Sequence, residues 1–373
     1  MMNMKISSID VIPISYPLKE EAFDATAKWS EFNCVLVRVI TSNGLIGIGE
    51  ISPLHGREMP IFEAIIKKKL EGQIVGENPL DREKLWIKMI GKGSSAFALS
   101  TKGAITSAVS AIDMALWDIV GQLLDTPLYN LLGGKYRDKV KLYVSFMGEV
   151  TVEKLKEFIR QGFKSVKVKV GFDVEKDLEK IKEIRECIGY DFDLMTDANQ
   201  GYSLSQAIMF SKRGRDYNIY WLEEPINIYN LKALRILANK SEIPIAIGEN
   251  YYTKSEFIEV VTNCIVDVIQ PDLNHVGGIT EIRKVASLAE CYDVMFAPHL
   301  HSVVGLAAGL HMLTATPNGL IAEYVVYGRK WEFRDRILRN CITIEDGWAR
   351  VINKRGIGVE IDESYVEQYK YRG

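Results

Sequence analysis

Short apolar segments recur eight times along the sequence from about residue 138 onward, at intervals of about 25 residues. Stretches with helical periodicity separate them. This alternation predicts parallel β-strands joined by α-helices, and eight such units close into a barrel. Barrel strands are buried on both faces, which explains why apolar and polar residues alternate only weakly within the segments. The eight segments are VKLYVSF, SVKVKVG, DLMTDAN, IYWLEEP, IPIAIGEN, VDVIQPDL, VMFAPHL and GLIAEYV.

The first 55 residues or so have a different pattern, which is that of antiparallel strands. The segment ISSIDVIPISY alternates apolar with polar residues, and two apolar runs flank Asn43-Gly44, a hairpin turn signal. Helical stretches follow, including an Ala-rich one near residues 104–123 whose small side chains favour close packing. The N-terminal part therefore predicts an α+β unit, and the residues after about 328 are expected to return and cover it.

Composition and charge exclude several classes of partner. The chain has 46 Lys and Arg against 49 Asp and Glu, so it lacks the basic excess that attracts nucleic acids or anionic membranes. The N-terminus lacks the pattern of a signal peptide, and no run approaches the roughly 18 apolar residues of a membrane span. We expect a cytoplasmic protein. The five cysteines lack any CxxC spacing, which indicates reduced thiols used in packing; they are Cys34, Cys187, Cys264, Cys291 and Cys341.

Residues capable of chemistry come last in the barrel segments. Lys167 and Lys169 close the second segment, and from there on one such position follows every 23 to 30 residues. The carboxyl ends of barrel strands all meet at one mouth, where barrel enzymes keep their active sites. We therefore expect these side chains to converge. The later positions are Asp197 and Asn199, Glu223, Glu249, Asp272, His299 and Glu323.

Three acids on consecutive strands, Asp197, Glu223 and Glu249, predict a metal site. One acid after a strand is often a helix N-cap or a surface charge. Three that converge in a partly buried mouth repel one another unless a cation neutralises them. No Cys or His lies among them, which favours a hard, oxygen-liganded ion such as Mg2+. Glu224 is expected to point the other way and to be structural.

Lys167 and Lys169 lie two apart, so they share one face of their strand. Desolvation and mutual repulsion are expected to push one of them toward its neutral form, as a general base requires. A bound cation and an anionic substrate lower the cost of keeping both lysines nearby. The alternative is a pair of lysines that extend from the strand edge into solvent.

A second candidate base is His299, which ends one strand while Asp272 ends the strand before it. A carboxylate next to an imidazole holds one tautomer and raises its basicity, so the pair predicts a dyad. The sequence HLH at 299–301 also resembles the paired histidines of metal-dependent barrel hydrolases. That alternative needs further histidines at strand ends, and neither His275 nor His311 ends a segment.

With these motifs in this order, the chain resembles the enolase superfamily, and within it the mandelate racemase subgroup, over almost its whole length. The resemblance implies an α/β fold with a (β/α)7β TIM-like barrel at residues 131–327. It also implies an N-terminal α+β capping domain at 1–130, which a segment at 328–373 completes. The motifs are Lys167-Val-Lys169, Asp197-Ala-Asn199, Glu223-Glu-Pro225, Gly248-Glu249-Asn250, Pro271-Asp272 and the strand end at His299.

The resemblance also implies a chemistry, in which a base removes the proton next to a carboxylate and an enediolate forms. Lys169 is the implied base on one face of the substrate, with Lys167 near the substrate carboxylate. The Asp272–His299 dyad works on the opposite face. The remaining implied roles are Mg2+ binding by Asp197, Glu223 and Glu249, a hydrogen bond from Glu323 to the enolate oxygen, and substrate contact by Asn199.

These residues do not fix the overall reaction, but the resemblance and the polar capping loops together lead us to expect an acid-sugar dehydratase that acts on an aldonate or aldarate and makes a 2-keto-3-deoxy acid. A racemase, an epimerase or a sugar-lactone cycloisomerase using the same intermediate is the alternative. A non-catalytic binding protein is disfavoured because every implied catalytic position is filled. We expect a homo-oligomer that binds a small carboxylate and no nucleic acid or membrane.

Capping loops at residues 17–31 and 91–100 are expected to select the substrate, and the first of them is expected to be a mobile lid. Both are polar, which suits a polyhydroxylated acid. The polar residues behind that expectation are Lys19, Lys28, Ser94 and Ser95.

Overall fold

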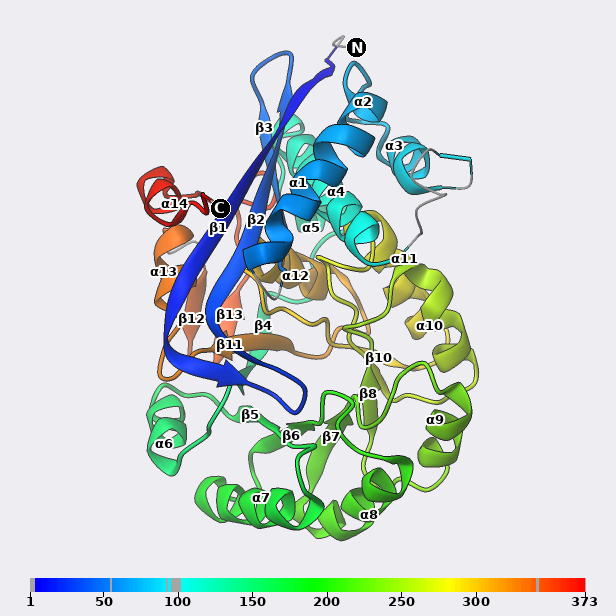
Figure 1. Cartoon of the computed structure of the whole chain (residues 1–373), viewed down its shortest axis with the longest axis vertical. Coiled ribbons are helices and arrows are strands. Elements are labelled where there is room, and N and C mark those ends of the chain that lie inside the picture. The colour runs from blue at the N-terminus through cyan, green and yellow to red at the C-terminus, as the bar shows by residue number, and fades with distance from the viewer. Residues whose placement is uncertain (1–3, 54–55, 92, 95–101, 340–341, 373) are drawn as a thin grey trace.

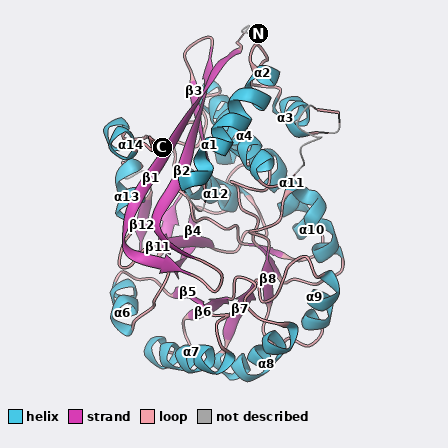
Figure 2. Cartoon of the chain, in the orientation of Figure 1, coloured by secondary structure: helices cyan, strands magenta, loops and turns pink. Residues whose placement is uncertain are grey.

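The computed structural model describes residues 4–53, 56–91, 93–94, 102–339 and 342–372. A capping domain sits on one end of a barrel, and the N-terminal strands run from the cap down beside the barrel (Figure 1). Helices surround the barrel strands, as expected for βα units (Figure 2). The predicted fold class is confirmed.

The capping domain is an antiparallel sheet of three strands packed against helices. Gly44 has a φ of 84° in the turn between the second and third strands, as the Asn-Gly signal predicted. The Ala-rich helix α4 lies so close to the third strand that a Cβ at Gly49 would be 1.9 Å from the backbone oxygen of Ala111. The elements are β1 (Ile6–Phe23), β2 (Lys28–Thr41), β3 (Ile46–Ile51), η1 (Gly56–Glu58), α1 (Met59–Ile65), η2 (Ile66–Leu70), α2 (Glu71–Ile74), α3 (Arg82–Ile90), α4 (Ala104–Leu123) and α5 (Leu128–Leu131).

Eight parallel strands form the barrel, and each coincides with one of the eight predicted segments. The last strand pairs with the first, and a bridge between Phe296 and Gly319 links the seventh strand to the residues just before the eighth. Seven βα crossings connect the strands. The strands are β4 (Lys139–Phe146), β5 (Ser165–Lys169), β6 (Asp193–Asp197), β7 (Ile219–Glu223), β8 (Ile245–Ile247), β9 (Val268–Ile269), β10 (Met295–Phe296) and β11 (Ala322–Val326).

Within residues 102–339, four of the seven α-helices between the barrel strands begin at an N-cap side chain, and the other three have no side-chain cap. Asp173 and Ser203, for example, accept hydrogen bonds from the backbone of the first helical turns that follow them. These caps set where the strand-to-helix loop ends in those four units, and the site residues lie at the strand ends or in the loops that follow them. The helices are α6 (Val152–Arg160), α7 (Val174–Ile188), α8 (Leu204–Gly214), η4 (Arg215–Tyr217), α9 (Leu231–Ala238), α10 (Thr253–Thr262), α11 (Gly278–Glu290) and α12 (Val304–Ala315).

The C-terminal segment contacts the barrel before it returns to the cap. Its strand β13 pairs antiparallel with β4, which adds a hairpin beside the barrel. The chain then reaches the cap, where Lys370 bridges to Ile14 of β1. The predicted return is present, and the hairpin is an addition that the sequence pattern did not indicate. The elements are α13 (Glu332–Ile337), β12 (Thr343–Glu345), β13 (Trp348–Arg350) and α14 (Glu363–Tyr369).

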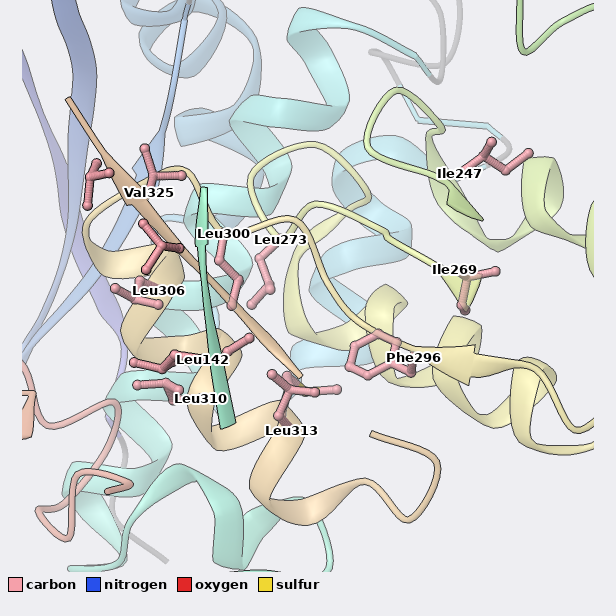
Figure 3. Packing of buried hydrophobic residues seen from close by; sticks show 14 of the residues in the cluster. Leu142, Ile247, Ile269, Leu273, Phe296, Leu300, Leu306, Leu310, Leu313 and Val325 are labelled. Atoms are coloured by element: carbon pink, nitrogen blue, oxygen red, sulfur yellow. The ribbon is translucent and has the colours of Figure 1, made fainter. Parts of the chain in front are cut away.

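Apolar side chains fill the space between the barrel strands and their helices. Leu310 of α12 and Leu142 of β4 both belong to this layer (Figure 3), and these two elements contact each other. Cys34 is buried as expected, whereas Cys264 and Cys291 are exposed, so the prediction that the cysteines serve packing is wrong for these two.

Within the described residues, one helix, α4, is long and apolar enough to cross a membrane, and 94% of its apolar window is buried inside the protein. The expectation that no run approaches 18 apolar residues holds for α4, because Asp113 and Asp118 interrupt its apolar sequence. Its apolar character is accounted for by burial, because it packs against β3 on one side and α11 on another.

Residues 17–31 do not form a loop. Strand β1 extends to Phe23 and β2 begins at Lys28, so only four residues make the turn. Lys19 pairs with Glu332 and Lys28 with Glu21, and neither lysine lines the cavity described below. The expected role of these two lysines in substrate selection is therefore wrong. Ser94 does not line that cavity either, and most of the 91–100 region, including Ser95, lies outside the described residues.

Candidate active site

The register of the barrel places the site residues in a row. Lys169 at the end of β5 pairs with Asp197 of β6, and Asp197 pairs in turn with Glu223 of β7. All three positions end their strands, so their side chains meet at the same mouth. The convergence predicted from the spacing of the segments is present.

Asp197, Glu223 and Glu249 offer carboxylate oxygens that all lie within 4.8 Å of one another. Asp197 and Glu223 are fully buried. Burial and the nearby charge of Asp197 raise the pKa of Glu223 to about 8. Two neutral donors, Trp221 Nε1 and Gln270 Nε2, hold Glu223 Oε2 at 3.1 and 2.7 Å. Crowded, buried, oxygen-only groups of this kind fit a hard divalent cation, which removes their repulsion.

The two lysines of β5 are buried against these acids. Lys167 Nζ lies 2.8 Å from Glu223 Oε1 and 3.0 Å from Glu323 Oε1. Lys169 Nζ lies 2.6 Å from Asp197 Oδ2. Burial works to lower the pKa of both lysines, but the carboxylates outweigh it and raise each pKa above its usual value. The expectation that one of these lysines is pushed toward its neutral form is therefore wrong for the protein without metal or substrate.

Asn199 and Glu323 connect the two sides of the mouth. Asn199 accepts from Lys169 Nζ at 2.9 Å and donates to Glu249 Oε1 at 3.2 Å. Glu323 of β11 accepts from the backbone N–H of Leu300 at 3.1 Å, while its other oxygen faces Lys167. Both residues lie at the predicted mouth, although their contact with a substrate stays a prediction.

His299 and Asp272 form a close pair on the opposite side of the mouth. Nδ1 of His299 lies 2.6 Å from Oδ2 of Asp272, and the two residues share a β-bridge. Nε2 of His299 points toward the acids, 3.3 Å from Glu249 Oε2. Burial lowers the pKa of His299, but Glu249, Glu323 and Asp272 together raise it to about 10. The geometry is that of an imidazole oriented by Asp272 at Nδ1, with Nε2 directed at the acids of the mouth.

Two further histidines lie beside this pair. The rings of His299 and His301 stack at 4.5 Å with planes 29° apart, and His275 stacks on His301 at 6.4 Å. Nδ1 of His299 and Nδ1 of His301 both face Oδ2 of Asp272, at 2.6 and 3.2 Å, so these three residues form a second group that could hold a metal ion. The hydrolase alternative needs further histidines, but Nδ1 of His275 contacts Ser107 instead. His311 lies elsewhere, buried against the backbone of Tyr129 and Ile357.

Glu224 does not point away from the site. The strand ends at Glu223, and Glu224 has a φ of 34°, which breaks the alternation on which that expectation depended. Its buried carboxylate accepts from Gln200 Nε2 at 3.0 Å and Asn250 Nδ2 at 2.9 Å. Glu224 lines the cavity, so the prediction that it is merely structural on the other face is wrong.

A cavity of about 580 Å³ opens between the cap and the barrel mouth. Thr26, from the turn of the first hairpin, and Trp29 of β2 line it from the cap side. Asp24 shapes this turn by accepting from the backbone of Thr26 and Ala27 at 2.7 and 2.9 Å. The barrel side contributes Lys169, Asn199, Glu249 and His299.

Sequence reasoning missed the polar contacts that α4 makes with the barrel. Ser107 contacts His275 Nδ1 at 2.9 Å, Ser110 accepts from the N–H of Gly277, and Asp113 accepts from Thr280. The three α4 residues are spaced by three, so they form a polar stripe on an otherwise apolar helix. That spacing is visible in the sequence and could have indicated a partner on that face.

Comparison with known proteins covers nearly the whole chain. Residues 14–133 match the mandelate racemase / muconate lactonizing enzyme N-terminal domain, and residues 150–365 match the enolase C-terminal domain-like family. Arabinonate dehydratase of Saccharolobus solfataricus is 32% identical over 345 residues, which cover 90% of each chain. D-galactarolactone cycloisomerase of Agrobacterium fabrum is 30% identical and aligns over 98% of this chain and 99% of its own.

Solved structures agree in fold. A racemase from Streptomyces coelicolor A3(2) with bound magnesium superposes with a TM-score of 0.87 at 28% sequence identity. The match covers 98% of this chain and 100% of that one.

Proposed function

The chain belongs to the enolase superfamily, in its mandelate racemase subgroup, and from this membership and the site geometry we propose that it is a Mg2+-dependent acid-sugar dehydratase. The observation that carries the proposal is the placement of two proton-transfer groups around one acid cluster. Lys169 contacts the cluster at Asp197, and His299 contacts it at Glu249. The substrate is a sugar acid with a hydroxyl on the carbon β to its carboxylate, and the product is a 2-keto-3-deoxy acid.

Asp197, Glu223 and Glu249 would hold the Mg2+ ion, which fits their crowded carboxylate oxygens. When bound, the ion supplies positive charge that stabilises the substrate carboxylate most strongly as it gains electron density. Lys167 adds a second positive charge at the barrel mouth, because its buried ammonium group is held between Glu223 and Glu323. Together these charges lower the cost of removing a very weakly acidic proton.

Lys169 accepts the proton from the carbon next to the carboxylate, the electrons of that C–H bond form a double bond to the carboxylate carbon, and the carbonyl π electrons move onto the carboxylate oxygens. Lys169 must be neutral for this step. Its raised pKa comes from the same carboxylates that are proposed to bind the cation. Asn199 fixes the position of its amino group through a 2.9 Å contact.

His299 completes the elimination from the other face of the substrate. Its Nε2 donates a proton to the β-hydroxyl; the carboxylate re-forms, a double bond forms between the α and β carbons, the carbon–oxygen bond breaks, and water leaves. Asp272 accepts from Nδ1, which keeps the proton on that nitrogen and stabilises the charged imidazole before the transfer. The resulting enol rearranges to the keto acid.

A cycloisomerase is the second candidate, because the galactarolactone enzyme aligns over 98% of this chain. It would use the same first step and then break a ring carbon–oxygen bond instead of releasing water. The same two residues suffice for both reactions. Cap residues such as Trp29, which face the cavity, then decide which substrate fits.

A library of aldonic acids, aldaric acids and sugar lactones tests the proposal. The Mg2+-loaded protein is incubated with each compound in deuterated water and followed by proton NMR. We expect a 2-keto-3-deoxy acid from at least one aldonate or aldarate. Turnover of lactones alone would favour the cycloisomerase. Deuterium exchange without loss of water from any compound would favour a racemase and contradict the dehydratase.

We also propose that the protein acts in the cytoplasm as a homo-oligomer. The cytoplasmic location is supported by the five cysteines, which are dispersed in the sequence without any CxxC spacing. The oligomeric state rests on the symmetric association that is common among soluble enzymes.

A further inference from the structure

Two barrel loops that carry catalytic residues are each held by a buried carboxylate of the cap. The first loop follows β9 and runs from Asp272 to the start of α11. Asp113 of α4 accepts from the backbone N–H of Thr280 at 2.8 Å and from its hydroxyl at 2.6 Å. Asp113 is fully buried, and burial raises its pKa to about 7. A cap residue therefore anchors the end of the loop that begins with Asp272.

The second loop follows β10 and runs from His299 to the start of α12. Glu50 at the end of β3 is fully buried, and Oε2 accepts from the N–H groups of Val303 and Val304 at 2.9 and 2.5 Å. These donors are amides at the start of α12 that have no acceptor within the helix itself. The helix dipole also favours a carboxylate at this position. Only three residues separate His299 from Val303, so the position of this turn constrains the imidazole.

The loop that follows Lys169 is held differently. Asp177, which belongs to α7 of the barrel, accepts from the N–H groups of Gly171, Phe172 and Asp173 at 3.0 to 3.1 Å. The barrel thus supplies its own support for the Lys169 side of the mouth. The cap supports the His299 side.

We propose that Glu50 and Asp113 are positioning residues that hold the Asp272–His299 dyad in register with the substrate. The proposal rests on the proposed function for its effect on catalysis. It assigns the cap a role beyond shaping the cavity, because the cap also sets the geometry of one of the two proton-transfer groups. A change at either acid should impair the His299 step and spare the Lys169 step.

The direct test is the hydrogen bond between His299 and Asp272, which needs no substrate. The chain has five histidines, so the Nδ1 proton of His299 can be assigned by NMR with the variant His299→Asn. We expect this signal to shift or broaden in Glu50→Gln and in Asp113→Asn. The matched control is Asp118→Asn, because Asp118 is another buried acid of α4 that accepts from backbone amides, those of Ile48 and Ile357.

The catalytic test compares dehydration with exchange of the substrate α-proton. In Glu50→Gln we expect dehydration to fall at least tenfold, while exchange and Mg2+ affinity stay within about threefold of the wild-type values. Asp118→Asn should keep the wild-type ratio of the two rates even if its melting temperature falls. If Glu50→Gln does not fold, Asp113→Asn and the milder Ser110→Ala test the neighbouring loop.

An unchanged His299 signal together with an unchanged rate ratio in the folded variants would overturn the positioning role. A failure of the dehydratase proposal has a different signature. In that case no acid sugar loses water, yet the His299 signal still reports whether Glu50 and Asp113 position the dyad.

Discussion

Lys169 and His299 contact opposite members of one acid cluster, with Lys169 Nζ 2.6 Å from Asp197 and His299 Nε2 3.3 Å from Glu249. The two residues come from β5 and from the loop after β10, which are separated around the barrel. A substrate bound at the acids therefore meets one of them on each face. This arrangement divides the proposed reaction into two separable proton transfers.

The first prediction separates these transfers by mutation. His299→Asn should lower dehydration by about 10²- to 10⁴-fold, the usual loss for a general acid, yet still permit exchange of the α-proton with solvent deuterium. Lys169→Ala should stop both reactions. Proton NMR in deuterated water measures both rates. Exchange that survives in Lys169→Ala and disappears in His299→Asn would reverse the assignment, and full dehydration by both variants would refute the two-group mechanism.

The second prediction concerns the metal. Glu223→Gln removes one carboxylate charge from the cluster, so Mg2+ affinity should fall by at least tenfold and activity should be lost. Trp221 and Gln270 still surround the side chain, so the fold should be retained. Isothermal calorimetry measures the affinity, and circular dichroism checks the fold. Unchanged Mg2+ affinity would remove Glu223 from the ligand set.

The third prediction tests the hairpin at residues 24–27. Asp24→Ala removes the acceptor that shapes the turn, and Trp29→Ala opens the cavity wall. Both should raise KM about tenfold or change the order of preference among sugar acids, with a smaller effect on Mg2+ affinity. Lys28→Ala is the control, because Lys28 is exposed and points to Glu21. Equal kinetics for all three variants would show that the hairpin does not select the substrate.

The fourth prediction concerns stability at acid pH. His311 accepts from the N–H of Tyr129 at Nδ1 and donates from Nε2 to the carbonyl of Ile357, which fixes a neutral imidazole. Burial lowers its pKa from 6.5 to about 4. The unfolded chain then binds the proton first as pH falls, so this residue should cost on the order of 3 kcal/mol of stability between pH 7.5 and pH 4.

Denaturant unfolding of the wild type and of His311→Gln across that pH range checks this value. Glu50 and Asp113 have raised pKa values, so they change stability with pH in the opposite direction to His311. Both acids are present in the wild type and in the variant, so the difference between the two proteins isolates the effect of His311. We expect the variant to lose less stability than the wild type as pH falls. Parallel stability curves would contradict the prediction.

The residues of the mouth could be predicted because the parallel strands of a barrel relate position in the sequence to position in space. Each strand is short, each is followed by a helix, and the last polar residue of each must reach the same end of the barrel. Position along the chain then implies position in space, as Asp197, Glu223 and Glu249 show. The hairpin at Asn43-Gly44 was predictable for a similar reason, because a tight turn depends on adjacent residues only.

The sequence by itself determined the order of the elements, the barrel and the set of chemical groups at its mouth, because these depend on local periodicity. Tertiary structure alone decided how Glu224 turns into the cavity and how Glu50 reaches the first turn of α12, 253 residues away along the chain. It also decided the pKa of Lys169, because burial and Lys167 lower this pKa while the carboxylates of other strands, chiefly Asp197, raise it. Such contacts join segments far apart in sequence, and no periodic pattern encodes the distance between them.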